Sequence, residues 1–183
     1  MKKAYKFIIP ILCCFLIGFI AGQIQESSIL NWYPYLNKPS LTPPNMVFPI
    51  AWAILYLCMG ISLGLILNSS HYGRKSLIRL FILQLIFNFT WSIFFFYMQN
   101  PLLGFINIIL LEFLIIVYSV KSYGINKISS ILFIPYILWV TKLMYIQLRH
   151  EVNKPELLQP SFHIPEQLLN RHYYIPHIAR LII

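Results

Sequence analysis

The sequence contains no aspartate and few charged residues of any kind. Only 10% of its 183 residues are charged, against about a quarter in typical soluble domains. The five acidic residues are all glutamates, whereas 14 residues are Lys or Arg, and the formal net charge is +9. So few charges cannot cover a soluble exterior, and an apolar content of 58% excludes a disordered chain. With a mean hydropathy of +0.70, the composition indicates a protein whose apolar surface faces lipid.

Cysteine is scarce, and the patterns that carry common catalytic chemistry are missing. The three cysteines, Cys13, Cys14 and Cys58, lie within apolar runs and have neither disulfide nor zinc spacing. The sequence has no paired carboxylates, no Gly-rich phosphate loop and no G-x-S-x-G. Its histidines lack ligand spacing, and all except His71 lie at or beyond the end of the last apolar run. We therefore expect no metal site and no required cofactor.

Long apolar runs are what the sequence has in quantity. A hydrocarbon core about 30 Å thick needs about 20 apolar residues of helix to cross it. The runs that qualify, or nearly so, are 7–22, 48–67, 77–98, 102–120 and 130–148. The first, with basic residues before it and small residues at its end, also resembles a signal peptide, but its length favours a retained helix. The pattern predicts an all-α membrane protein, a bundle of five transmembrane helices.

The segments between the runs predict the domain organisation. Residues 23–47 hold four prolines and are expected to form a long loop, whereas short polar turns are expected at 68–76, 99–101 and 121–129. From His150 onward the chain is polar and rich in proline, which suits neither a span nor one long helix. We therefore predict a five-helix transmembrane domain at 1–149 and an irregular tail outside the bilayer at 150–183.

Basic residues gather at the ends of the apolar runs and not in a polar stripe, which favours anchoring to lipid headgroups over nucleic-acid binding. With five spans, most of them lie on the N-terminal side of the bilayer, and the short loops on the opposite side hold only Lys38. The N-terminal group comprises Lys2, Lys3, Lys6, Arg74, Lys75, Arg79, Lys121 and Lys127. Because positive charge marks cytoplasmic loops, we expect a cytoplasmic N-terminus.

Polar and aromatic side chains share helix faces within the runs. Gln84, Asn88 and Trp91 are spaced i, i+4, i+7 and so lie on one face of the third run. Amides at bilayer depth either join helices by hydrogen bonds or line a pocket, and the two roles are compatible. In the second run Trp52 and Tyr56 precede a G-x-x-x-G pair, which permits close helix packing. Trp52 could also belong to an interfacial aromatic belt.

The fourth and fifth runs contain residues that are unusual in a membrane helix. Pro135 removes a backbone hydrogen bond and is expected to kink the fifth helix on the face that carries Trp139. Glu112 lies near the middle of the fourth run and Lys142 lies in the fifth. Because a lone charge at that depth is costly, we expect the two to pair, or Lys142 to extend outward to the headgroups.

Three stretches together resemble one known family. Residues 32–60 read W-Y-x-x-L-x-K-P-S-x-x-P-P-x-x-V-F-x-x-x-W-x-x-L-Y-x-x-M-G, residues 84–91 read Q-x-x-x-N-x-x-W with two phenylalanines at 94 and 95, and residues 132–139 read L-x-x-P-Y-x-x-W. In order and spacing these resemble the translocator protein family, also called tryptophan-rich sensory protein (TspO/MBR) or peripheral benzodiazepine receptor. The likeness covers about residues 7–141.

The resemblance implies a function that composition alone does not. It implies a five-helix bundle, usually a homodimer, whose pocket under the 23–47 loop binds porphyrins such as protoporphyrin IX and benzodiazepine-type ligands. The implied role is that of a receptor in tetrapyrrole or stress regulation, in a bacterial inner membrane. Alternatives are light- and oxygen-dependent porphyrin breakdown, for which Trp52 and Trp139 would be the candidate catalytic residues, and transport of porphyrins or sterols. The implied ligand-binding residues are Trp32, Pro43, Pro44, Trp52, Tyr56, Gln84, Asn88, Trp91 and Trp139, with Lys38 a candidate partner for porphyrin carboxylates.

After Trp139 the chain departs from the family pattern. Members continue with small residues and a Leu-Asn pair, whereas this chain reads T-K-L-M-Y-I-Q-L-R-H from residue 141. A divergent C-terminus or an altered reading frame would account for the difference. Leu143, Tyr145 and Arg149 satisfy a proposed cholesterol pattern, one that often matches by chance.

Overall fold

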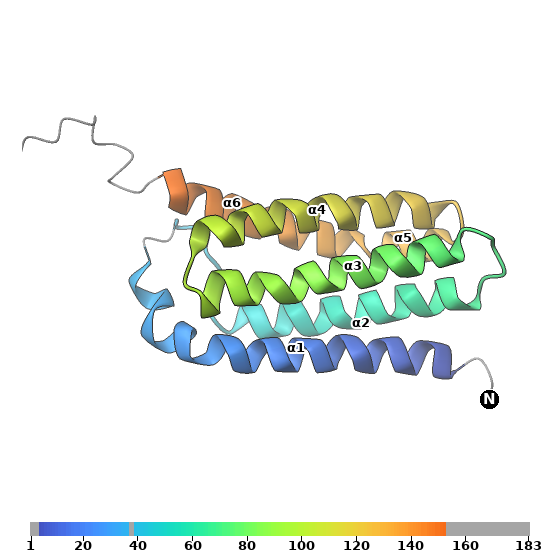
Figure 1. The fold of residues 1–183 in the computed structure, drawn as a ribbon, viewed down its shortest axis with the longest axis horizontal. Helices are drawn as coiled ribbons and strands as arrows, with labels where there is room; N and C mark the ends of the chain where they lie inside the picture. Colours follow the sequence, from blue (N-terminus) through green and yellow to red (C-terminus); the bar gives the residue numbers. More distant parts are fainter. Residues whose placement is uncertain (1–3, 37–38, 153–183) are drawn as a thin grey trace, which may run out of the picture. The chain divides into compact units, whose positions relative to one another are not determined.

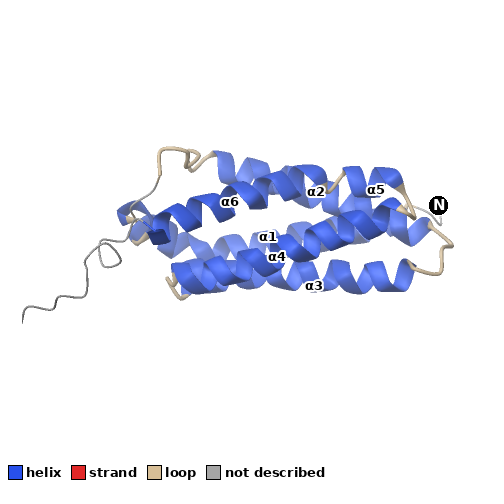
Figure 2. Cartoon of the chain, turned by 90° about the horizontal axis from the view of Figure 1, so that it is seen from above, coloured by secondary structure: helices blue, strands red, loops and turns tan. Residues whose placement is uncertain are grey.

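The structure, a computed structural model, describes residues 4–36 and 39–152, and all of its regular elements there are helical (Figures 1 and 2). The predicted tail at 150–183 lies outside these residues except for its first three, and Lys38 lies outside them as well. The elements are α1 Tyr5–Asn31, η1 Tyr33–Tyr35, α2 Val47–Asn68, α3 Arg74–Ser92, η2 Ile93–Tyr97, α4 Pro101–Tyr123, α5 Lys127–Ile131 and α6 Ile134–Val152. Here η1 is a 3₁₀ turn and η2 a π-helical turn.

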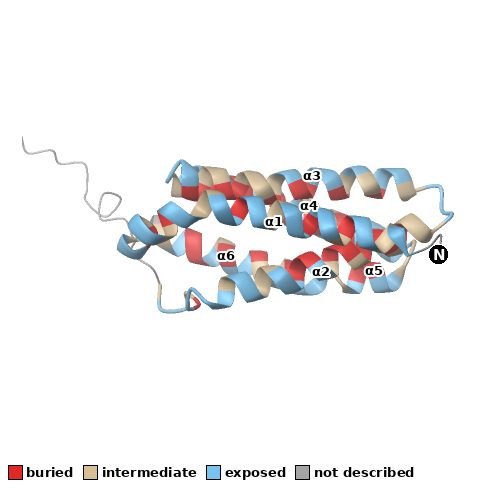
Figure 3. Cartoon of the chain, turned by 90° about the horizontal axis from the view of Figure 1, so that it is seen from below, coloured by how far each residue is buried: buried red, intermediate tan, exposed pale blue. Residues whose placement is uncertain are grey.

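Five helical segments of the described chain are long and apolar enough to cross a membrane, which confirms the predicted fold class. Two of them combine adjacent elements: α3 with η2, and α5 with α6. Figure 3 shows the buried residues on the inner faces of the helices and exposed residues on the outer faces. Because those outer faces carry many large apolar side chains, lipid is the environment that suits them.

The first helix is longer than predicted. α1 continues to Asn31, so the prediction of a loop from residue 23 is wrong for its first part. Residues 23–31 contain neither proline nor glycine, and two of their polar side chains, Gln25 and Ser28, form hydrogen bonds with the neighbouring span. The Ser28 hydroxyl donates to the carbonyl of Phe96 at 2.6 Å, which explains why a polar turn of helix remains packed at this depth.

The fifth span is interrupted, and the interruption differs from the expected kink. α5 ends at Ile131 and α6 begins at Ile134, so Pro135 lies in the first turn of a new helix and not within a bent one. Proline lacks an N–H and disfavours helical conformation in the preceding residue, so it is tolerated in a first turn. Because of the break, the fifth span consists of two consecutive helices, α5 and α6.

Glycines allow α1 and α2 to pack closely. A Cβ added at Gly60 would lie 2.6 Å from the Cα of Ile11, closer than atoms of two helices can approach. Gly64 faces the ring of Phe7 in the same way, and on α1 Gly18 faces the ring of Tyr56. The G-x-x-x-G pair of the second run is therefore part of a close helix contact. This contact joins the N-terminal half of α1 to the C-terminal half of α2.

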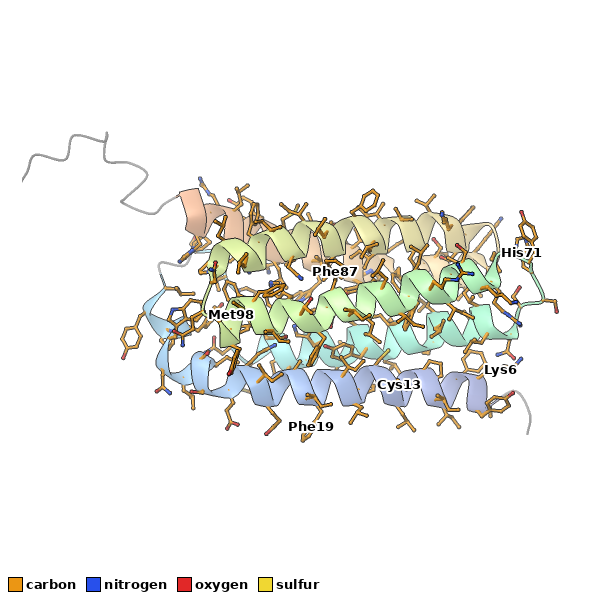
Figure 4. The ribbon with its side chains drawn as sticks, in the orientation of Figure 1. Lys6, Cys13, Phe19, His71, Phe87 and Met98 are labelled. Carbon is orange, nitrogen blue, oxygen red and sulfur yellow. The ribbon has the colours of Figure 1, made fainter. Side chains whose placement is uncertain are left out.

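The two ends of the bundle differ in charge and in connections. Lys6 lies at the same end as His71 of the α2–α3 turn, and Met98 lies at the opposite end (Figure 4). At the first end the Lys6 ammonium donates to the carbonyl of Leu67 at 3.1 Å and so satisfies part of the C-terminus of α2. The remaining lysines and arginines of the described chain that precede residue 130 also belong to this end, as the charge pattern predicts.

Candidate ligand-binding site

A cavity of about 450 Å³ lies between α1, α2 and α3. Ligand pockets for small molecules typically measure about 300–1,000 Å³ and combine apolar walls with a few polar groups. This cavity has that character, because aromatic and small side chains predominate in its walls. The lining residues are Phe15, Gly18, Phe19, Ala21, Gly22, Gln25, Ile29, Tyr33, Asn45, Phe48, Pro49, Trp52, Ala53, Tyr56, Asn88, Trp91, Ser92 and Phe96.

Aromatic rings form the α2 wall of the cavity. Phe48, Trp52 and Tyr56 are four residues apart, so their side chains follow one face of α2. The ring of Trp52 stacks on that of Tyr56 with centroids 5.6 Å apart and lies 6.4 Å from the ring of Trp91. Trp91 in turn stacks on Phe95 at 5.5 Å and an interplanar angle of 10°. A continuous aromatic surface therefore extends from α2 to η2.

Asn88 is both a cavity residue and a link between helices. Its side-chain oxygen accepts a hydrogen bond from the Tyr56 hydroxyl at 3.2 Å, and its side-chain nitrogen donates to the Tyr136 hydroxyl at 2.8 Å. These bonds join α2, α3 and α6 through one buried amide. The Asn88 side chain therefore both joins helices by hydrogen bonds and lines the cavity.

The α1 wall is the part of the site that the sequence interpretation missed. Ala21 and Gly22 are small, Gly18 is covered by the ring of Tyr56, and Gln25 follows Gly22 by one turn. The Gln25 amide donates to the Ser92 hydroxyl at 2.6 Å, which connects α1 to α3 beside the cavity. The spacing of residues 18, 22 and 25 repeats the i, i+4, i+7 pattern of the third run and was the available signal. The loop that the sequence predicts from residue 23 would not place Gln25 on this helix face.

Several other predicted site residues lie behind the cavity wall. Trp139 does not line the cavity but contacts Phe48, which does, with ring centroids 5.7 Å apart. Trp32 similarly lies against Phe95 at 5.5 Å. Gln84 is completely buried one turn before Asn88, and its amide has no hydrogen-bond partner among the described residues. The structure therefore places Trp52, Tyr56, Asn88 and Trp91 together at the cavity.

The predicted covering segment contributes less to the cavity than expected. Pro43 is buried and Pro44 is exposed, and neither lines the cavity. Tyr33 and Asn45 are the lining residues that come from outside the spans. Burial raises the pKa of the Tyr33 hydroxyl above its usual range.

Glu112 and Lys142 do not form the expected ion pair in the described part of the chain. The Glu112 carboxyl instead accepts a hydrogen bond from the Thr141 hydroxyl at 2.6 Å. Lys142 is exposed, and its ammonium lies 5.9 Å from the ring centroid of Trp139. The pairing prediction is wrong because the fifth span presents Thr141, one residue earlier, to α4. The alternative, in which Lys142 extends outward, agrees with its exposure.

The residues of the proposed sterol pattern do not share one surface. Leu143 is buried in the bundle, whereas Tyr145 and Arg149 are exposed. The Arg149 guanidinium lies over the Tyr145 ring at 5.9 Å, so these two form a patch on the outer face of α6 without Leu143. Over the described residues, no three His, Cys or Glu side chains come together in a group that could hold a metal ion.

Comparisons with known proteins agree with the motifs. The sequence model of the TspO/MBR family matches residues 10–152, which includes the part of α6 that departs from the motif after Trp139. A tryptophan-rich protein TspO of Archaeoglobus fulgidus is 37% identical over 135 residues, covering 74% of this chain and 88% of that protein. One of Chlorobaculum tepidum is 33% identical over 73% of this chain and 85% of its own length. The human translocator protein is 26% identical over 67% of this chain and 74% of that protein.

Proposed function

The chain belongs to the TspO/MBR family, and from that premise we propose that it is a receptor for porphyrin-like tetrapyrroles, which bind in the cavity between α1, α2 and α3. It is an integral membrane protein with five apolar spans. The observation that carries the proposal is the cavity itself, a space of ligand size in which aromatic rings of α2, α3 and η2 face a stretch of α1 that includes glycine and alanine. The names of its relatives, which include a tryptophan-rich sensory protein of Cereibacter sphaeroides, suit a regulatory role in tetrapyrrole or stress responses.

The shape and chemistry of the cavity suit a flat, apolar ligand. The Trp52 ring offers a face for stacking, and stacked aromatic pairs gain about 0.5–1.5 kcal/mol beyond their buried area. On the opposite side Gly22, with nothing within 4 Å of the position of an added Cβ, lets a ring approach the α1 backbone. Burial of the apolar ring surface adds roughly 25 cal/mol per Å². The same features would accept synthetic benzodiazepine-type ligands or the ring system of a sterol.

A second candidate function is light- and oxygen-dependent breakdown of bound porphyrin. It is favoured by the two tryptophans of the cavity, Trp52 and Trp91, whose ring centroids are 6.4 Å apart. Both would lie beside a bound macrocycle, where they are placed to exchange electrons with it. Trp139, which the family resemblance implies as the second catalytic residue, does not line the cavity and packs against Phe48. Product formation under light that disappears in Trp52→Phe, while binding persists, would distinguish this function from binding alone.

The setting of the receptor is part of the proposal. We propose that it resides in a bacterial inner membrane with its N-terminus in the cytoplasm, because the basic residues of the described chain that precede residue 130 gather at the end of the bundle that holds Lys6 and the α2–α3 turn. We further propose a homodimer, as the family resemblance implies.

Porphyrin titration of the full chain in lipid nanodiscs tests the binding function. Protoporphyrin IX should bind with a shift of its absorbance that saturates, and Trp52→Phe should weaken the affinity about three- to tenfold because a stacking surface is lost. Trp32→Phe is the matched control, since Trp32 lies outside the cavity wall. Absence of saturable binding, or equal losses in the two variants, would contradict the proposal.

A further inference from the structure

Glu112 places a carboxyl group near the middle of a membrane span. It is the twelfth of the 23 residues of α4, so about 16 Å of helix separates it from either end at 1.5 Å per residue. Its side chain is only 8% exposed. A glutamate side chain is shorter than that of lysine and does not extend to the headgroups from this depth. The carboxyl is therefore stabilised inside the bundle, whatever its protonation state.

The hydrogen bonds of this carboxyl are too few for an ion. The Thr141 hydroxyl oxygen lies 2.6 Å from Oε1 of Glu112 and 2.8 Å from the carbonyl oxygen of Ile137. A hydroxyl has a single proton, so these two acceptors share one donor. The second carboxyl oxygen, Oε2, is buried and has no hydrogen-bond partner among the described residues. An ionised carboxylate can accept about four hydrogen bonds, and most of these sites would be empty here.

Neighbouring groups do not supply the missing charge. Lys142 follows Thr141 in the chain, but it is exposed and its ammonium lies 5.9 Å from the ring centroid of Trp139. The hydroxyl of Tyr136 interacts electrostatically with Glu112 and brings no positive charge. No salt bridge joins Glu112 to a residue that the structure describes. Burial of an ion under these conditions costs far more than burial of a neutral acid with one unpaired O–H.

Lipid borders the contact between Glu112 and Thr141. Thr141 is exposed on α6 although it lies well inside the fifth span. Phe113, beside Glu112 in the chain, is 63% exposed, and Leu138, one turn before Thr141, is 65% exposed. Because these surfaces belong to membrane spans, acyl chains cover them. A lipid-soluble molecule therefore reaches the contact from the bilayer, whereas a charged, water-soluble one is held back by the hydrocarbon.

We infer that Glu112 is a proton-binding site, a neutral carboxylic acid that can be modified from the lipid phase beside Thr141. Oε1 accepts from the Thr141 hydroxyl, and Oε2 carries the proton. Neither residue lines the cavity between α1, α2 and α3, so the site is separate from the proposed receptor function.

The reagent class that fits this site is a hydrophobic carbodiimide, which reacts with protonated carboxyl groups. A carboxyl oxygen bonds to the central carbon of the N=C=N group while the carboxyl proton passes to one nitrogen. The acyl group then migrates from oxygen to nitrogen and leaves a stable N-acylurea. The reaction is an addition, so it needs no further reactant and releases none.

Carbodiimide labelling of the full chain in nanodiscs at neutral pH tests the inference. Dicyclohexylcarbodiimide should give an adduct that peptide mass spectrometry places on Glu112, and the adduct should be lost in Glu112→Gln. Glu26→Gln is the matched control, because Glu26 is exposed near the C-terminal end of α1, and it should leave the adduct in place. A water-soluble carbodiimide with an added amine should label Glu26 and spare Glu112. The reverse pattern, or no adduct on Glu112, would overturn the inference.

Infrared spectra measure the proton without any reagent. The unaltered chain at neutral pH should show the C=O stretch of a protonated carboxyl, which shifts in D₂O and is absent in Glu112→Gln. Glutamine keeps the size and the carbonyl of the neutral acid, so this variant should fold. If it does not fold, the spectrum of the unaltered chain still decides, because a chain without the band has an ionised Glu112 and contradicts the inference. Neither measurement depends on porphyrin binding.

Discussion

At the scale of single residues, buried amides and hydroxyls hold this bundle together where helices meet. Lipid offers apolar surfaces no reason to associate, so interhelical hydrogen bonds and close packing have greater weight than in water. Asn88 is the clearest case, because one side chain joins two tyrosine hydroxyls on different helices. Stability and ligand binding therefore depend on the same residue.

Replacing Asn88 by Leu should lower both properties. The variant leaves the hydroxyls of Tyr56 and Tyr136 without this partner and should cost about 1–2 kcal/mol of unfolding free energy, near the upper end for hydrogen bonds within membranes. Reversible unfolding in mixed micelles measures it. Asn107→Leu is the control, because Asn107 donates to Thr90 away from the cavity at 2.9 Å. The control should lose stability and keep porphyrin affinity, whereas unchanged affinity in Asn88→Leu would contradict the assignment.

A second prediction at this scale concerns the carboxyl in α4. Because Glu112 contacts Thr141 and not Lys142, the effects of Glu112→Gln and Lys142→Met on unfolding free energy should add. Glu112→Gln and Thr141→Val should instead be non-additive by about 0.5 kcal/mol or more, as expected for residues in contact. Double-mutant cycles in micelles measure both couplings. A larger coupling for the Lys142 pair would restore the ion pair that the sequence suggested.

At the scale of elements, the position of α1 decides whether a cavity exists. α1 packs closely against α2 where the glycines of each helix face residues of the other. Hydrogen bonds of Gln25 and Ser28 join α1 to α3 and η2. Between these two contacts Gly22 has no neighbour within 4 Å of the position of an added Cβ, so space for a ligand remains there. The helix is thus fixed at both ends of the site while its middle remains open.

Gly60 of α2 and Gly22 of α1, both within helices, test this arrangement. Gly60→Ala should destabilise the protein by about 1–3 kcal/mol, because the added methyl meets the backbone of Ile11, which cannot rotate away. Gly22→Ala meets open space and should leave stability unchanged or raise it by up to about 1 kcal/mol, since alanine favours helix. Unfolding free energies of both variants in micelles provide the comparison. Equal effects would show that α1 and α2 are not held by the Gly60 contact.

At the scale of the whole described bundle, the two ends face different compartments. One end carries Lys6 and the α2–α3 turn, and the other carries η1 and the α3–α4 connection. The lysines and arginines of the described chain that precede residue 130 belong to the first end, which is why that end is proposed to be cytoplasmic. The cavity residues Tyr33 and Asn45 lie toward the other end, so a ligand is proposed to be covered on the external side.

Single cysteines at the two ends report this orientation. Tyr72 in the α2–α3 turn is 93% exposed, and Tyr35 at the opposite end is 85% exposed. In intact cells a membrane-impermeant thiol reagent should label Tyr35→Cys and should label Tyr72→Cys only after the membrane is opened. The parent chain, whose three cysteines lie within the spans, measures the background. The reverse labelling would place the N-terminus outside.

The sequence by itself determined the spans, because hydrophobic length and polar breaks are local properties of the chain. It also indicated the aromatic and amide faces of α2 and α3, since residues four apart on a helix share a face whatever the neighbours are. The resemblance of three motifs to a known family added an expectation about the class of ligand.

Only the tertiary structure decided which faces meet. Gln25 and Ser92 are 67 positions apart, and no periodicity relates them. The extension of α1 to Asn31 depends on partners in α3 and η2, and the separation of Glu112 from Lys142 depends on the rotation of α6 after its break. Contacts between helices follow from packing across the bundle, which a linear pattern does not encode.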